Sequence, residues 1–337
     1  MRESVIPGAV RVAFTREPDY FAADGLAGAE DVTVVARREN QVIGSGRCSI
    51  YPLLRNGVRR RIGYLGSLRV AAGVRASPRL IRDGYELLRH EVESRADGFF
   101  TSIAADNMRA RRVLELGGRL GLPAYRPLGD LVTLIAPVRR KTGKSAAGAS
   151  DHELIEFLAR NAQRFQLSLA WDPALFQDLS RHGVSARNFT VVRRNGSIVA
   201  CAAIWDQRAF RQIVIDGYGG ALEIARPIIN ATLVTRGRPR LPAPGAVLAQ
   251  GAVLGASVSD PRDWGELWPD LRALAMARGL SWLALARDAR DPELAVLRRL
   301  TSGREYRTTL YEVTWAGADR WPEPWDGRVF RPEVGLL

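Results

Sequence analysis

The alternation of apolar and polar positions divides the first 138 residues into short strands and three helices. The long helix is the clearest of these, because Ile81, Tyr85, Leu88 and Val92 fall on one of its faces. A strand–helix–strand segment implies parallel pairing and a hairpin implies antiparallel pairing, so the pattern predicts a mixed sheet. The predicted strands are 10–14, 33–38, 42–53, 61–70, 99–104 and 131–137, and the predicted helices are 17–23, 79–95 and 107–116.

The second half of the chain repeats this pattern. Residues 33–44 (TVVARRENQVIG) match residues 190–200 (TVVRRNGSIVA), and each is a strand, a polar turn and a second strand. Further on, each half has a buried strand that leads through acidic residues into a helix, at 99–107 and at 282–291. The long period predicts duplication of one domain rather than a solenoid.

A small, polar and basic segment (RRKTGKSAAGAS) separates the two copies and is typical of a linker. The helix that follows can be capped by Asp151. We expect the final residues, which hold three tryptophans among prolines, to pack back on the domains. The predicted organisation is a first domain 1–138, a linker 139–150, a second domain 151–315 and a tail 316–337.

Charge adds one indication of a partner. The 337 residues carry a net charge of +13, and only Lys141 and Lys144 among the 49 basic residues are lysine. Residues 1–144 alone carry a net charge of +10. Such a charge is typical of a protein that binds an anionic partner, such as a phosphorylated cofactor, nucleic acid or a membrane surface. The alternative is an arginine codon bias in a GC-rich bacterial genome. No aromatic platform accompanies the arginines, which disfavours nucleic acid.

Other features exclude several classes of protein. Cys48 and Cys201 lie in apolar segments and are expected to be buried thiols, and the three histidines have no ligand spacing, so no metal is expected. No stretch of 18 uncharged apolar residues is present, and the first residues lack the pattern of a signal peptide. We expect a cytoplasmic protein that does not bind a membrane.

The segment from Tyr64 to Ile81 is the first that carries chemistry. A strand ends, a turn follows and a helix starts, and the free amides of a first helical turn attract phosphate. Ser77 is a suitable cap, Pro78 is tolerated in the first turn, and Arg75 and Arg79 add positive charge. These residues predict a phosphate site; the alternative is a connecting loop with solvated arginines.

A second segment couples a strand end to a polar cap. Asp106 or Asn107 can cap the helix, Ala110 and Leu114 share one of its faces, and a Gly-Gly pair ends it. The alternative interpretation gives Asn107 a capping role alone.

Together the two segments resemble the GCN5-related N-acetyltransferase (GNAT) superfamily over about residues 8–138. Leu68-Arg69-Val70 matches its acyl-CoA strand, Arg75 matches the first position of its R/Q-x-x-G-x-G/A turn, and Asn107 with Ala110 matches its N-x-x-A helix start. The resemblance implies an α/β (α+β) fold: two tandem GNAT-like domains, each a mixed, mostly antiparallel sheet flanked by helices. Residues 151–315 resemble the same fold more weakly. Carboxylates at 260–263 replace the phosphate turn there, so we expect a degenerate second copy.

The chain departs from the family pattern at three kinds of position. Ala76, Pro78 and Leu80 stand where relatives have glycine, and Leu114 stands where relatives have a general-acid tyrosine. Ser67 replaces a frequent carboxylate, and Tyr64 and Tyr125 are the nearest hydroxyl replacements by segment. Some relatives use a chain-terminal carboxylate, for which Leu337 is the corresponding candidate.

The resemblance implies an acyltransferase that moves an acetyl or small acyl group from acetyl-CoA to an amine of a small molecule or peptide. The protein would act as a monomer or homodimer. The alternative is a non-catalytic acyl-CoA-binding or sensing protein. The implied catalytic residues are Tyr125, Tyr64 and Ser67, and the implied cofactor-binding residues are Leu68, Arg69, Val70, Arg75, Ala76, Ser77, Pro78, Arg79, Leu80, Asn107 and Ala110.

Overall fold

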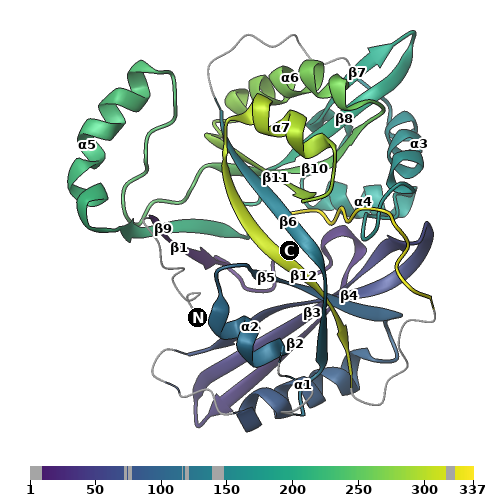
Figure 1. The fold of residues 1–337 in the computed structure, drawn as a ribbon, viewed down its shortest axis with the longest axis vertical. Coiled ribbons are helices and arrows are strands. Elements are labelled where there is room, and N and C mark those ends of the chain that lie inside the picture. Colours follow the sequence, from purple (N-terminus) through teal and green to yellow (C-terminus); the bar gives the residue numbers. More distant parts are fainter. Residues whose placement is uncertain are drawn as a thin grey trace.

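A computed structural model describes residues 10–71, 74, 78–115, 117, 121–138, 148–315 and 323–337. Ten strands form one sheet in the order β2-β3-β4-β5-β12-β6-β11-β10-β8-β7 (Figure 1). Its strands are β2 (Glu30–Arg38), β3 (Gln41–Arg55), β4 (Val58–Val70), β5 (Gly98–Ala104), β6 (Ala124–Pro137), β7 (Phe189–Arg194), β8 (Ser197–Trp205), β10 (Gln250–Val258), β11 (Trp282–Asp288) and β12 (Arg304–Thr314).

The sheet is mixed and mostly antiparallel, as predicted. Only β4 with β5 and β10 with β11 pair in parallel among the described strands, and each pair is connected through a helix. The helices are α1 (Pro78–Val92), α2 (Met108–Glu115), α3 (Asp151–Ala162), α4 (Pro173–Arg181), α5 (Gly220–Thr235), α6 (Trp264–Ala277) and α7 (Glu293–Thr301), with short 3₁₀ turns at Leu26–Gly28, Ala186–Asn188 and Pro261–Asp263.

The two copies exchange their last strands in the middle of this sheet. Strand β12 of the second copy pairs antiparallel with β5 of the first, whereas β6 of the first copy pairs antiparallel with β11 of the second. The exchanged strands also pair with each other along their length, from Arg304 with Ile135 to Thr314 with Ala124. The ladder hydrogen bonds of each copy are therefore completed by the other. The domain boundaries expected above remain a prediction.

Side chains on the two faces of the sheet enter different cores, because neighbouring residues of a strand point to opposite faces. Phe99 packs with the α1 side chains of the first copy, and Val253 packs with the α6 side chains of the second. Their neighbours Phe100 and Leu254 enter one core shared by both copies, which also contains apolar residues of α3 and α4. The tail contributes Phe330 and Leu336 to this shared core.

A second, two-stranded sheet lies beside the large one. Strand β1 (Val10–Thr15) pairs antiparallel with β9 (Gln212–Tyr218), and so joins the start of the first copy to an insertion in the second. Helix α5 follows β9 and projects away from the large sheet (Figure 1). The irregular segment 239–247 returns along it, held by two hydrogen bonds between the Asn230 side chain and the backbone of Leu241.

Two local predictions were wrong. Residues 17–23 form turns instead of a helix, because the Asp19 carboxylate accepts the backbone N–H of Phe21 and fixes a local turn. The cap of α3 is Ser150 rather than Asp151: its hydroxyl accepts the N–H of Glu153, whose carboxylate accepts the N–H of Ser150. No helix in the described part of the chain is long and apolar enough to cross a bilayer.

Candidate active site

Strand β4 separates from its parallel neighbour β5 within the first copy. The two strands pair only from Ile62 to Tyr64, opposite Gly98 to Phe100. Three residues after the last pair, β4 has a bulge: Gly66 pairs with Arg47 and Arg69 pairs with Ser45, so Ser67 and Leu68 have no partners in the β3 ladder. Ser67 has a φ of 54°, in the left-handed region that few non-glycine residues adopt. The bulge therefore lies at the mouth of a gap between two strands.

This gap opens into a cleft of about 490 Å³. Its walls come from β1, β2, β3, β4, α1, β5, α2 and β6. Of the residues that the sequence singled out, the cleft brings together Tyr64, Ser67, Leu68, Arg69, Val70, Leu80, Asn107, Ala110 and Tyr125. Leu114 also lines it, where the family pattern has a tyrosine. The roles assigned to these residues remain predictions.

Tyr64 and Ser102 lie on the side of the cleft that faces the shared core. The Tyr64 Oη and Ser102 Oγ are 3.0 Å apart, and the Tyr64 ring packs 5.1 Å from the ring of Phe100. Burial raises the pKa of Tyr64 above its ordinary value, which keeps the phenol protonated at neutral pH. A protonated phenol beside the bulge can donate a proton and cannot accept one.

Tyr125 lies on the opposite, helix side. Its hydroxyl is 2.6 Å from that of Tyr85 on α1, and burial, together with Tyr85, raises the pKa of Tyr125 well above its ordinary value. The only polar partner described for the Tyr125 hydroxyl is therefore another phenol. Leu88 and Ile103 give this side of the cleft an apolar wall.

Helix α2 begins at the bottom of the cleft. The Asn107 side chain accepts the backbone N–H of Ala110 at 3.1 Å, which makes Asn107 the cap of the helix. Both residues line the cleft, so the capping role and a role in ligand binding are compatible.

The predicted phosphate turn is only partly described. Arg75, Ala76 and Ser77 lie outside the described residues, and α1 begins at Pro78. Arg79 is exposed in the first turn of α1, 3.7 Å from the Asp83 carboxylate, and is not among the residues that line the cleft. Its assignment to a phosphate remains a prediction.

Several arginines surround the core-facing side of the cleft. Arg16 donates to the Ser67 hydroxyl at 3.3 Å, and buried Arg47 pairs with Asp24 and Asp31 at 2.7 and 2.8 Å. Burial, and then the charge of Arg211, lowers the pKa of Arg69 to about 10. The field in this region is therefore positive.

The second copy has the same backbone irregularity. Strands β10 and β11 pair only from Gln250 to Ala252, and three residues later β10 bulges at Gly255, which has a φ of 59°. The gap is filled here, because the Arg287 guanidinium donates to the Ala256 carbonyl at 3.0 Å. The expected acidic turn is also present, with Asp260 and Asp263 capping each other's backbone.

Comparison with solved structures identifies the fold. Saccharomyces cerevisiae N-myristoyltransferase with bound myristoyl-CoA and inhibitors superposes with a TM-score of 0.58 at 12% identity, over 90% of this chain and 72% of that chain. A second structure of that enzyme with bound myristoyl-CoA gives 0.57 at 12% identity, over 97% and 77%. A GCN5-related N-acetyltransferase from Sphaerobacter thermophilus gives 0.49 at 14% identity, over 88% and 84%.

The chain therefore has the GNAT fold, and the superposition on the yeast enzyme extends over both copies. At these identities the likeness concerns the fold alone. No family model and no curated protein sequence matches the chain.

Sequence reasoning did not single out Ser102 or Arg211. Ser102 lines the cleft because β5 pairs with β4, and Arg211 lies just before β9, with partners far away in the sequence. A catalytic role for Leu337 in the tail remains a prediction. Only the bulge of the second copy has a signal in the sequence: a glycine inside the apolar run 253–258 is typical of a bulge.

Proposed function

We propose that the protein transfers an acyl group from an acyl-CoA to an amine, with the thioester held in the cleft between β4 and β5. The observation that carries the proposal is the bulge at Ser67 and Leu68, which lies where β4 has left β5. Backbone N–H groups released from a ladder can donate to a carbonyl oxygen that becomes negative during the reaction. The pantetheine arm would take the place of the missing strand.

The reaction requires two proton movements. The neutral amine nitrogen attacks the thioester carbon, the C–N bond forms, the C–S bond breaks, and the proton lost by nitrogen balances the one that the thiolate gains. Tyr64, protonated and 3.0 Å from Ser102, is the group we assign to protonate the thiolate. Tyr125 is the alternative from the helix side. Water can carry the proton away from the amine.

The arginines support the choice of an amine acceptor. An ammonium group near Arg16 and Arg69 would meet like charge, which lowers its pKa and favours the neutral, nucleophilic form. We propose that the acceptor, a small molecule or a peptide, approaches from this side. Acetyl-CoA is the proposed donor, and longer acyl-CoA donors are compatible with the apolar wall on the helix side.

Calorimetric titration with acetyl-CoA and with acyl-CoAs of increasing chain length tests the binding, and a panel of amines followed by thiol release tests the transfer. We expect saturable binding with one acyl-CoA for each chain and turnover with at least one amine. Binding without turnover for any amine would favour the acyl-CoA sensor, for which Leu114 in the cleft is the supporting observation. Absence of binding by every acyl-CoA would refute both functions.

A further inference from the structure

The tail 323–337 enters the second copy at the position that corresponds to the proposed thioester site of the first. The Glu333 carboxylate accepts the backbone N–H of Gly255, the bulge residue of β10, at 3.0 Å. Gly255 follows the last β10–β11 pair by three residues, as Ser67 follows the last β4–β5 pair. A carboxylate oxygen of the chain itself thus takes the place in which the first copy would hold a carbonyl oxygen.

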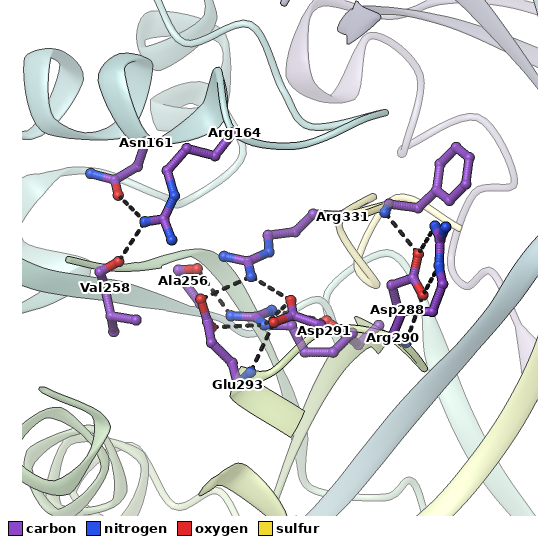
Figure 2. Close-up of polar contacts among 12 residues, drawn as sticks. Asn161, Arg164, Ala256, Val258, Asp288, Arg290, Asp291, Glu293 and Arg331 are labelled. Carbon is purple, nitrogen blue, oxygen red and sulfur yellow. Dashed lines mark hydrogen bonds and ion pairs between the residues drawn. The ribbon is translucent and has the colours of Figure 1, made fainter. Parts of the chain in front are cut away.

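Buried charges fix the tail at this place. Arg331 donates to Asp291 at 2.5 Å and to Glu293 at 2.9 Å, and Glu293 also accepts from Arg287 at 3.2 Å (Figure 2). All four residues are at most 6% exposed. Breaking such a buried network is costly, because it leaves a charge without its partner. The tail is therefore a fixed part of the second copy.

The same tail continues toward the first copy. The Leu336 N–H donates to the Glu333 carbonyl at 2.9 Å, so Glu333 sits at the start of the last turn. Arg211 then donates to the carbonyls of Gly335 and Leu337 at 3.0 and 3.1 Å. The positive charge of Arg211 acts on Tyr64 and lowers its pKa against the larger effect of burial. Hydrogen bonds thus join the second bulge to Arg211, and the charge of Arg211 acts on Tyr64 in the first cleft.

We propose that the tail is the permanent occupant of the acyl-CoA position in the second copy, and that Glu333 is a positioning residue for the reaction in the first. Glu333 holds residues 335–337 in place, and these hold Arg211 beside Tyr64. On this proposal the second copy binds no ligand and instead positions residues of the first site. This inference rests on the proposed acyl transfer in the β4–β5 cleft.

The test compares Glu333→Ala, which loses the acceptor for the Gly255 N–H, with Glu333→Gln, which keeps a carbonyl oxygen there. The matched control is Arg328→Ala, a change in the same tail at a side chain that pairs with Asp326. With the amine found active in the panel above, we expect Glu333→Ala to lower kcat at least tenfold while the Kd for acetyl-CoA stays within twofold. Glu333→Gln should retain most of the activity, and Arg328→Ala should match the wild type.

Amide hydrogen exchange gives a readout that needs no acceptor. Glu333→Ala should raise exchange at least tenfold in residues 250–258 and 335–337, and Glu333→Gln should not. Unchanged exchange at 335–337, or acyl transfer with an unchanged kcat in Glu333→Ala, would overturn the inference. Failure of the proposed function is a different result, because the wild type itself would then bind no acetyl-CoA.

Discussion

The two copies share their backbone irregularities and differ in what fills them. In each copy two parallel strands separate after three paired residues, and a bulge follows three residues later. Ile103 lines the open gap of the first copy. In the second copy Arg287 bridges the gap to the Ala256 carbonyl and Glu333 accepts the N–H of the bulge.

In both copies the backbone forms a gap between two parallel strands next to a bulge. The side chains around each gap determine whether a ligand can enter it. An open gap with apolar walls can take a ligand. In the second copy the Arg287 guanidinium bridges the gap, and the carboxylates of Asp260 and Asp263 that follow would repel an anionic cofactor. On the proposal above, the filled second gap serves as a scaffold for the first.

The largest effect is expected when the copies are separated. Fragments 1–140 and 146–337, expressed singly, should be insoluble or unfolded, because β5 and β11 each lose the neighbouring strand supplied by the other copy. Coexpression should give a soluble complex with the circular dichroism of the intact chain. A fragment that unfolds cooperatively on its own would contradict the strand exchange.

Blocking one gap should distinguish the copies directly. A Cβ at Gly84, which lines the first cleft on α1, meets no atom within 4 Å, so Gly84→Phe can fill the cleft without a backbone clash. We expect the Kd for acetyl-CoA, measured by calorimetry, to rise at least about 100-fold, or by about 2.7 kcal/mol. Gly265→Phe is the matched control, on the corresponding helix α6 with equally open space. Equal losses in both variants would show that the cleft is misassigned.

Removing single hydroxyls should separate the two sides of the first cleft. Tyr64→Phe should lower kcat by about 10²-fold, the lower end for loss of a general acid, and leave the KM for acetyl-CoA nearly unchanged. Tyr125→Phe should have a smaller effect, since its hydroxyl contacts Tyr85 on the helix side. A larger loss of kcat in Tyr125→Phe than in Tyr64→Phe would indicate that Tyr125 is the proton donor.

A pH dependence of stability is also expected in the second copy, where it shifts the Tm by only a few degrees. Burial raises the pKa of Glu333 from 4.5 to about 7. A carboxyl whose folded-state pKa exceeds its unfolded value stabilises the fold most below the unfolded value, and this contribution is lost as the pH rises toward 7.

Glutamine at position 333 stays uncharged at every pH. The Tm of Glu333→Gln should therefore rise by a few degrees relative to the wild type between pH 5 and pH 8, for a free-energy change of at most about 3 kcal/mol. Thermal unfolding at both pH values measures this difference. A constant difference would mean that Glu333 does not titrate in this range.

Sequence patterns predicted the elements and the class of fold because strands and helices impose local periodicities. The cap at Asn107 and the acidic turn at 260–263 left local signals in the residue types, whereas the bulge at Ser67 and Leu68 was not predicted. The exchange of β6 and β12 left none, because either pairing satisfies the same alternation of side chains. The contacts of Arg211 and Glu333 join residues more than 70 positions from their partners, so no sequence spacing could predict them.

A crystal structure with bound acetyl-CoA would show which of the two copies holds the thioester. We expect the cofactor between β4 and β5, with its thioester oxygen at the backbone of Ser67 and Leu68, and with the Glu333 carboxylate still accepting the N–H of Gly255. Acetyl-CoA between β10 and β11, with the tail displaced, would contradict this expectation.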